Sequence, residues 1–164
     1  MLVRNAIIQD LPKIIEIYNS TIPSRMVTAD IEQVCIDDKL NWFHQHHPDS
    51  RPLWVIENDN NTIGWVSFQD FYGRPAYSVT AEISIYIDEA CRNKGFGKKI
   101  LSYALTQCHQ LKIETLVGFI FEKNKASLQL FRNMGFEEWG SLKDIAVIDN
   151  EYLSLKIYGK KIDQ

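Results

Sequence analysis

Apolar and polar residues alternate with a period of two in some stretches of the chain and repeat at helical spacing in others. Successive side chains point to opposite faces of a strand, whereas positions i, i+3, i+4 and i+7 share one face of a helix. The alternating stretches predict strands in LVRNAI, LWVIE, TIGWVSFQDF, AEISIYI, TLVGFIF and two final stretches that meet at Asp149-Asn150. The helical stretches predict four helices, which begin near Asp10, Asp30, Gly97 and Asn124, the second running to about His46.

These predicted elements follow the order β-α-α-β-β-β-α-β-α-β-β. Runs of strands mixed with strand–helix alternation are typical of an α/β fold, here with a mixed sheet. The length of 164 residues fits one domain, so we expect residues 1–164 to form a single domain. In AEISIYI, Glu82, Ser84 and Tyr86 should share one face of the strand.

Composition narrows the class of protein. Hydrophobic residues make up 45% of the chain and charged residues 24%, as in soluble globular proteins. The net charge of -3 argues against general nucleic-acid binding, and no apolar run is long enough to predict a membrane span. The cysteines Cys35, Cys91 and Cys108 form no CxxC, and the first residues are too charged for a signal peptide. We therefore expect a cytoplasmic protein without structural disulfides.

The segment RNKGFGKKI lies between the strand AEISIYI and the third predicted helix. Unpartnered N–H groups at a helix N-terminus attract anions, and glycine lets the backbone approach a phosphate closely. Together with the positive charge of Arg92 and the lysines, this predicts a phosphate or pyrophosphate site. The spacing fits neither the P-loop GxxxxGK[ST] nor the dinucleotide fingerprint GxGxxG, and a solvated surface turn is the alternative.

Two spaced motifs resemble those of the GNAT acetyltransferase superfamily. RNKGFG is similar to its [Q/R]-x-x-G-x-[G/A] motif, and NKASLQLFRNMGF is similar to its N-x-x-[A/S]-x-x-L-[Y/H/F]-x-x-x-G-F motif. The stretch FYGRPAYSVTAEISIYI further resembles the phosphinothricin and methionine sulfoximine acetyltransferase group. The resemblance reaches to about residue 142. It implies a GNAT-like fold, with a mixed, mostly antiparallel sheet flanked by helices, and an enzyme that transfers acetyl from acetyl-CoA to an amine. We expect no metal.

The same resemblance implies how acetyl-CoA is held. Backbone amides of the loop would bind the pyrophosphate, and the end of the preceding strand would pair with the pantetheine arm and polarise the acetyl carbonyl. Asn124 and Ser127 would contact the cofactor, although a helix cap also accounts for both residues. The implied cofactor-binding residues are Ile85, Tyr86, Ile87, Arg92, Asn93, Lys94, Gly95, Phe96, Gly97, Lys98, Asn124 and Ser127.

Acetylation of an amine requires a neutral nitrogen, yet a lysine-like amine is only about one part in 2,500 neutral at pH 7. A base must therefore take a proton. Glu82 aligns with the glutamate that serves as base in the resembling group, and we expect partial burial to raise its pKa, a water relay, or both. The alternative for Glu82 is an edge-strand side chain in solvent.

The thiolate of CoA that leaves the thioester can require a proton. Many members of the superfamily have a tyrosine at the position of Phe131, which has no proton to donate. A thiol has a pKa of about 8.5, so the thiolate can leave unaided or take a proton from water. An acyl-enzyme on Cys91 or Cys108 is the alternative, but the pattern places Cys108 in helix packing, so we expect direct transfer.

Arg74 is the candidate for binding an anionic group of the acceptor, with Tyr72 and Tyr77 beside it, because guanidinium binds carboxylate or phosphinate through two parallel hydrogen bonds. A solvated loop arginine is the alternative. The group's G-x-W-x-D feature is absent from VIDNEYLSL in the last predicted hairpin. We therefore expect a small amine that carries a carboxylate, such as an amino acid or an analogue like phosphinothricin or methionine sulfoximine.

The run HQHH has no carboxylate or cysteine to complete a metal site, so we expect a solvated helix end there. The resemblance also implies a homodimer. Two other functions stay open: acetylation of protein or peptide N-termini, whose α-amines lose a proton more readily, and a non-catalytic acyl-CoA-binding sensor. Glu82 argues against the sensor.

Overall fold

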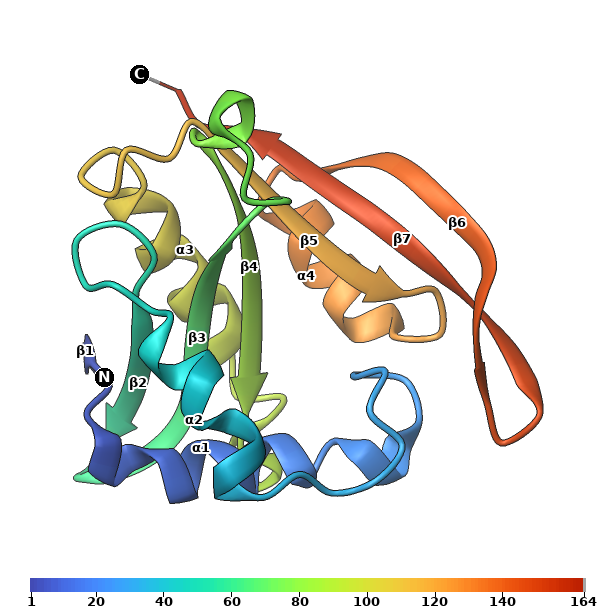
Figure 1. The fold of residues 1–164 in the computed structure, drawn as a ribbon, viewed down its shortest axis with the longest axis horizontal. Helices are drawn as coiled ribbons and strands as arrows, with labels where there is room; N and C mark the ends of the chain where they lie inside the picture. Colours follow the sequence, from blue (N-terminus) through green and yellow to red (C-terminus); the bar gives the residue numbers. More distant parts are fainter. Residues whose placement is uncertain (164) are drawn as a thin grey trace.

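Seven strands form one mixed sheet in the order β1-β2-β3-β4-β5-β7-β6 in the computed structural model, which describes residues 1–163 (Figure 1). Neighbouring strands are antiparallel except β4 and β5, which run parallel. The expected α/β fold with a mostly antiparallel sheet is therefore confirmed. The strands are β1 (Leu2–Asn5), β2 (Leu53–Asn58), β3 (Asn61–Asp70), β4 (Thr80–Ile87), β5 (Thr115–Phe121), β6 (Glu137–Ile148) and β7 (Glu151–Lys161).

Helices cover both faces of this sheet (Figure 1). On one face Ile14 packs with Val55 and Trp65, and on the other Leu101 and Phe131 belong to a larger buried cluster. The helices are α1 (Leu11–Asn19) and α2 (Ile36–His44) on the first face, and α3 (Phe96–Gln107) and α4 (Lys125–Asn133) on the second. Short 3-10 turns are η1 (Ile8–Asp10), η2 (Ile22–Ser24), η3 (Pro75–Tyr77) and η4 (Glu89–Cys91).

The alternation in β4 divides its side chains between these two layers. Ile83 is 2% exposed and packs in the cluster beneath α3, whereas Tyr86 packs against the cluster formed with α1. The predicted sharing of one face by Glu82 and Tyr86 follows from the same alternation and is confirmed by their cross-strand partners Gln69 and Trp65 on β3. The strand therefore separates an apolar side from a side that carries polar groups.

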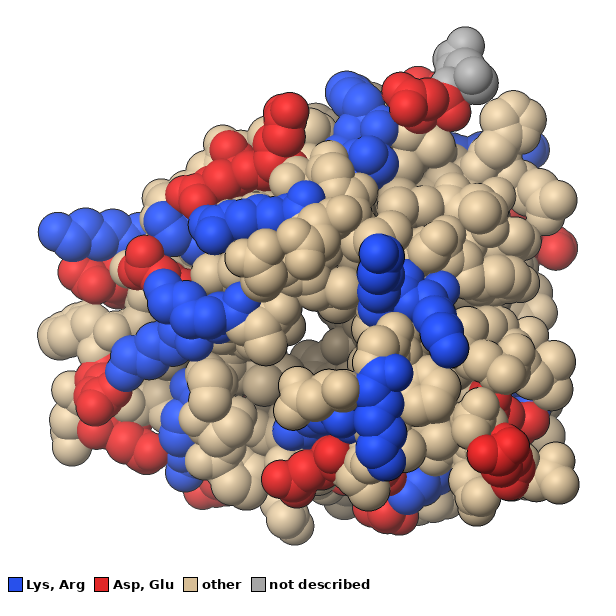
Figure 2. All heavy atoms as spheres, turned by 180° about the vertical axis from the view of Figure 1, so that it is seen from behind, with Lys and Arg blue, Asp and Glu red and all other residues tan. Residues whose placement is uncertain are grey.

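The parallel pairing of β4 with β5 is short. It covers Thr80–Glu82 opposite Thr115–Val117 and then stops, while β4 continues to pair with β3 and β5 with β7. Beyond Glu82 the two strands diverge (Figure 1), and Figure 2, viewed from behind, shows a narrow opening through this part of the molecule with Lys and Arg side chains around it. The sheet thus has a gap at its centre.

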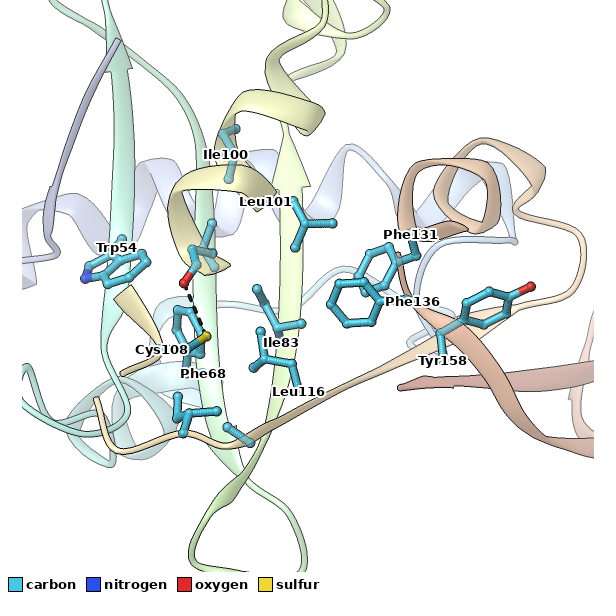
Figure 3. Packing of buried hydrophobic residues seen from close by; sticks show 14 of the residues in the cluster. Trp54, Phe68, Ile83, Ile100, Leu101, Cys108, Leu116, Phe131, Phe136 and Tyr158 are labelled. Carbon is cyan, nitrogen blue, oxygen red and sulfur yellow. Dashed lines mark hydrogen bonds between the residues drawn. The ribbon is translucent and has the colours of Figure 1, made fainter. Parts of the chain in front are cut away.

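Close packing fixes β5 and α4 beside this gap. Figure 3 shows Phe131 and Phe136 side by side near Tyr158, with Ile83 and Leu116 adjacent in the same core. A Cβ added to Gly118 of β5 would lie only 2.5 Å from Cε1 of Phe131, so the ring of Phe131 rests directly on the bare backbone. Glycine is required here by the close approach of the ring.

The second helix differs from the expectation. Asp30 does not cap it; α2 begins at Ile36, and Asp38 accepts a hydrogen bond of 2.7 Å from the backbone N–H of Cys35. The carboxylate of Asp30 instead accepts a hydrogen bond from the Tyr18 hydroxyl. The segment from Asp30 to the cap residue Cys35 lies outside the helix, and Asp30 makes this tertiary contact instead.

The end of α2 also differs from a fully solvated helix end. His44 and His47 are exposed, but His46 is half-buried, with its ring edge-on to Trp42 at 4.8 Å and its Nδ1 2.8 Å from the Trp42 carbonyl oxygen. Burial lowers the pKa of His46. The solvated interpretation is therefore wrong for His46, because Trp42 offers its ring a place to pack.

Most other predicted boundaries agree closely. The turns at Asp59-Asn60 and Asp149-Asn150 have positive φ at both residues, as tight hairpins require. Asn124 caps α4, and its side chain accepts from the N–H of Ser127 as expected. α3 begins at Phe96, one residue before the predicted start, because Gly95 adopts φ +80° at the cap. Asp10 sits at the predicted cap of α1, but its carboxylate binds Arg4 and the N–H of Ile7.

Replacement of Gly118 by alanine should destabilise the fold. Because the new Cβ would overlap the ring of Phe131, we expect Gly118→Ala to lower the free energy of unfolding by about 1–3 kcal/mol in urea denaturation. Gly140→Ala is the matched control, since its Cβ would meet the Ile157 side chain at an ordinary 3.5 Å. Equal stability of the two variants would contradict this account of the packing.

Candidate active site

The loop from Asp88 to Gly95 connects the end of β4 to the start of α3. Asp88 accepts a hydrogen bond from the N–H of Ala90, and the Nε of Arg92 donates to the carbonyl oxygen of Ile87 at 3.0 Å. Asn93 and Gly95 both have positive φ, at 59° and 80°. These two left-handed residues turn the chain sharply, so that α3 starts immediately beside the end of β4.

This loop is suited to hold a pyrophosphate. The first N–H groups of α3 have no intrahelical partner, and the helix dipole favours an anion at this end. The Nη2 of Arg92 is buried and, among the described residues, has no hydrogen-bond partner. A buried donor that lacks a partner is costly, and an anionic oxygen would satisfy it. The residues present therefore fit the phosphate groups of a coenzyme A molecule.

The end of β4 presents a free backbone edge to the gap in the sheet. The edge from Ser84 to Ile87 pairs with β3 on one side, and its pairing with β5 has already ended at Glu82. Gly97 at the start of α3 lies close to α4, because a Cβ added to Gly97 would lie 3.1 Å from Cδ2 of Leu130. The gap is thus lined by β4, by the start of α3 and by α4, and an extended chain can pair with its free edge.

Asn124 and Ser127 lie at the start of α4. The Oδ1 of Asn124 accepts a hydrogen bond of 3.1 Å from the Ser127 N–H, so the cap that sequence also indicated is present. Both residues begin the helix that follows β5, and Asn124 is half-buried. The side chain of Asn124 and the backbone N–H of Ser127 therefore form a helix cap.

Glu82 occupies the position where β4 and β5 separate. Its cross-strand partners are Gln69 on β3 and Val117 on β5. Burial raises the pKa of the Glu82 carboxyl above its ordinary value. None of the hydrogen bonds or ion pairs found within residues 1–163 involves its side chain, so no neighbouring cation offsets the cost of its charge.

Glu82 opens into a cleft of about 340 Å³ between the sheet and the first two helices. The floor carries cross-strand pairs that change from aromatic, at Trp65 and Tyr86, to polar, at Gln69 and Glu82. The Trp65 and Tyr86 rings stack with centroids 4.3 Å apart. The full lining is Ile14, Ile15, Tyr18, Lys39, Trp42, Trp65, Ser67, Gln69, Glu82, Ser84 and Tyr86.

The three candidate acceptor residues do not line this cleft. Arg74 and Tyr77 line a neighbouring hollow of about 700 Å³, and Tyr72 is 80% exposed on the surface. Gln69 lines both hollows, so they adjoin beside Glu82. The loop that carries Arg74 is held at its base by Arg51, whose Nη2 donates to the Ser78 carbonyl oxygen at 2.7 Å.

Phe131 and Cys108 are both arranged for packing rather than for proton donation or acyl transfer. Phe131 is 5% exposed and packs on Gly118, with no hydroxyl to offer. Burial raises the pKa of the Cys108 thiol to about 12, and its Sγ points to the Ala104 carbonyl oxygen. Cys108 is therefore a packing residue, as its position in the helical pattern indicated, and it is unsuited to carry an acyl group.

The cleft also contains functional candidates that sequence reasoning missed. Tyr18, Lys39 and Trp42 come from α1 and α2, and Gln69 comes from β3. Their spacing along the chain is ordinary helical or strand periodicity, so only the packing of α1 and α2 over the sheet brings them together. The alternation in TIGWVSFQDF could have indicated that Gln69 shares a face with Trp65.

A family model described as Acetyltransferase (GNAT) family matches residues 11–136. That range includes the diverging strands β4 and β5, the loop before α3, Glu82 and α4. The chain belongs to the GNAT acetyltransferase family. It is accordingly an acetyl-CoA-dependent N-acetyltransferase.

Individual relatives cover almost the full length. The Bacillus subtilis protein YwnH, whose provisional name is phosphinothricin acetyltransferase, is 52% identical over 163 residues, or 99% of each chain. An L-methionine sulfoximine/L-methionine sulfone acetyltransferase of Salmonella typhimurium is 26% identical over all of this chain and 96% of its own. A solved phosphinothricin acetyltransferase of Sinorhizobium meliloti in complex with acetyl-CoA superposes with a TM-score of 0.90, at 25% identity, over 98% of this chain and 88% of that one.

Two further findings concern what the described residues lack. Within residues 1–163 no group of three or more His, Cys, Asp or Glu side chains is arranged to hold a metal ion. No helix of the described chain is both long and apolar enough to cross a membrane.

The raised pKa of Glu82 predicts how stability depends on pH. The folded state binds the Glu82 proton more tightly than the unfolded state, so the carboxylate lowers stability as pH rises above its ordinary pKa of 4.5. We therefore expect Glu82→Gln to have a free energy of unfolding at least equal to that of the wild type at about pH 7–8. The advantage should shrink as pH falls towards about 4.5, measured by urea denaturation at several pH values.

The exposed Glu32 provides the control for that series. Glu32→Gln removes the same charge from an exposed side chain and therefore controls for the change in net charge. A Glu82→Gln protein that is less stable than the wild type at neutral pH would contradict the assignment of burial as the cause of the shift.

Proposed function

We propose that the protein transfers the acetyl group of acetyl-CoA directly to the amine of a small acceptor, with Glu82 as general base. The acceptor class is an amino acid or an analogue such as phosphinothricin or methionine sulfoximine. The observation that carries the proposal is the position of Glu82 at the point where the gap in the sheet meets the cleft. Its carboxylate is half-buried and has no ion-pair partner among the described residues.

The carboxylate of Glu82 matches what the acceptor amine requires. An ammonium group must lose a proton before it attacks, and a base with a raised pKa takes that proton more readily than an ordinary glutamate. Because the cleft brings the acceptor to the same place as the strand edge, the nitrogen can approach the carbonyl carbon while its proton goes to Glu82 or to a water between them.

We assign the residues beside the gap in the sheet to the binding of acetyl-CoA. Acetyl-CoA supplies an activated thioester, and we assign its binding to the loop from Arg92 to Lys98, to the β4 edge from Ile85 to Ile87, and to Asn124 and Ser127. The backbone N–H groups of β4 can donate to the acetyl carbonyl oxygen, where negative charge develops during attack. The buried Nη2 of Arg92 supports the assignment of the pyrophosphate to this loop.

Release of the thiolate needs no side chain of its own in this proposal. Phe131 cannot donate a proton, and a thiolate with a pKa of about 8.5 is a competent leaving group. Water that enters the gap can protonate it afterwards. Direct transfer is favoured over an acyl-enzyme because the Cys108 thiol is buried and its pKa is raised to about 12.

The acceptor class rests on the printed names of the relatives and on Arg74. The relatives are named for phosphinothricin and for methionine sulfoximine or sulfone, which all carry a carboxylate beside the amine. We assign Arg74, with Tyr72 and Tyr77, to the distal anionic or polar group of such an acceptor. The hollow that Arg74 lines adjoins the cleft at Gln69, which makes this reach possible.

Replacement of Glu82 should slow turnover strongly and leave the binding of acetyl-CoA unchanged. We expect Glu82→Gln to lower kcat by about a hundred- to ten-thousand-fold in a CoA-release assay, because a positioned general base contributes that much. Calorimetry should give the same affinity for acetyl-CoA in both proteins. Glu32→Gln serves as the matched control, and unchanged turnover in Glu82→Gln would refute the assignment of the base.

A panel of acceptors distinguishes the proposed function from the two alternatives. Amino acids, sulfoximines, polyamines and peptides are compared for CoA release, and we expect turnover with amino acids or their sulfoximine and sulfone analogues. Turnover with peptides alone would favour an N-terminal acetyltransferase. Donor binding without turnover on any acceptor would favour an acyl-CoA sensor.

We also propose a homodimer in which the β6–β7 hairpin contributes to the interface. The hairpin lies at the edge of the sheet and extends away from the helices (Figure 1). A row of apolar side chains on it is exposed, which favours a protein contact. These side chains are Trp139, Leu142, Ile145, Val147 and Tyr152.

Sedimentation equilibrium tests the dimer. We expect the wild type to sediment at twice the mass of the chain and the double variant Ile145→Lys/Val147→Lys to sediment as a monomer, because lysines on an exposed strand disfavour association. Circular dichroism controls for folding of the variant. A monomeric wild type would rule out the proposal.

A further inference from the structure

One charged side chain in the acceptor cleft has no role in the chemistry described so far. Lys39 projects from α2, and its side chain is 26% exposed. Its Nζ lies 5.0 Å from the ring centroid of Tyr18 and 5.9 Å from that of Trp42. The ammonium is thus held over two aromatic faces at the wall of the cleft that contains Glu82.

The ammonium of Lys39 lacks a close anionic partner among the described residues. Its nearest carboxylate oxygen is Asp30 Oδ2 at 3.9 Å, the outer limit of an ion pair, and that oxygen already accepts a hydrogen bond from Tyr18. None of the hydrogen bonds found within residues 1–163 has Lys39 as its donor. A partly buried ammonium without a strong hydrogen-bond acceptor is free to bind an incoming anion.

The charges that line the cleft complement an amino acid. Glu82 and Lys39 are the two charged side chains of its lining, and they form no ion pair with each other. An α-amino acid carries an ammonium and a carboxylate on the same carbon. The ammonium can face Glu82 while the carboxylate faces Lys39, and each charge then meets its opposite in a partly desolvated space.

The positions of the two hollows decide which cation takes that carboxylate. A carboxylate on the carbon that bears the amine must lie in the same hollow as the base. Lys39 lines the hollow of Glu82, whereas Arg74 lines the adjoining one beyond Gln69. Arg74 can therefore reach only a group that is farther along the acceptor.

We propose that Lys39 binds the α-carboxylate of the acceptor and thereby selects α-amino acids over amines that lack this group. The inference rests on the proposed function, because it requires the cleft of Glu82 to be the acceptor site. Lys39 is then a specificity-determining residue, and its aromatic neighbours Tyr18 and Trp42 hold the ammonium at the wall of the cleft in the absence of acceptor.

The test compares an acid with its amide. L-Methionine sulfone and L-methionine sulfone amide have the same side chain and the same reacting amine, but the amide has no carboxylate. Steady-state kinetics are measured for the wild type, Lys39→Met and Lys39→Arg. Methionine keeps the apolar stem over the rings, and arginine keeps the charge.

We expect Lys39→Met to lower kcat/KM for the acid by roughly 10- to 100-fold, mainly through KM, because a charge-assisted hydrogen bond is lost. The same variant should change kcat/KM for the amide less than about 3-fold, and Lys39→Arg should retain most of the activity on the acid. Lys143→Met, which removes an exposed lysine of β6, should leave both acceptors unaffected.

Two results overturn the proposal and are distinguishable from a failure of the proposed function. An equal loss for acid and amide in Lys39→Met would show that Lys39 only shapes the cleft. Loss of the discrimination in Arg74→Gln, with Lys39→Met unchanged, would assign the carboxylate to Arg74. If the wild type acetylates neither compound nor any other amino acid, the proposed function fails, and the role of Lys39 fails with it.

Discussion

The arrangement of the whole site depends on the end of one strand pairing. β4 and β5 share only the short parallel ladder from Thr80 to Glu82, and every feature of the site follows from their separation beyond it. The separation frees the backbone edge of β4 and opens a passage between the two faces of the sheet. It also places Glu82 at the boundary between a paired and an unpaired part of the strand. Parallel pairing makes this possible, because both strands leave the ladder in the same direction and carry α3 and α4 to the two sides of the gap.

The same geometry places the carboxylate of Glu82 where its negative charge is poorly solvated. Glu82, at the last paired position of a central strand, is half-buried, and its neighbours Gln69 and Val117 offer no positive charge. The fold therefore keeps a group whose ionisation opposes stability at neutral pH. Under the proposed function, the raised pKa suits Glu82 to accept a proton from an amine, so stability and catalysis make opposite demands on this residue.

Local patterns in the sequence were sufficient for most of the fold and for the conformation of the loop between β4 and α3. The alternation in AEISIYI and the turn at Asn93 and Gly95 act over a few residues, so periodicity and glycine placement predict them. The lining of the cleft could not be predicted in this way, because α2 starts at Ile36 rather than near Asp30, whose carboxylate instead accepts a tertiary hydrogen bond from Tyr18. Lys39 and Trp42 reach the cleft through that same packing, and nothing in their own neighbourhood along the chain indicates it.

Phe131 shows how packing constrains the chemistry on the other side of the gap. Its ring rests on the bare backbone of Gly118 and against Phe136, so the residue anchors α4 to β5. A tyrosine at this position would have to place its hydroxyl within the same close contact or move the ring off the glycine. Phe131 therefore packs α4 tightly against β5 at a position where a tyrosine could have donated a proton. This exchange is consistent with a reaction whose demanding step is removal of the proton from the amine, because a thiolate leaves readily without help whereas an ammonium cannot attack.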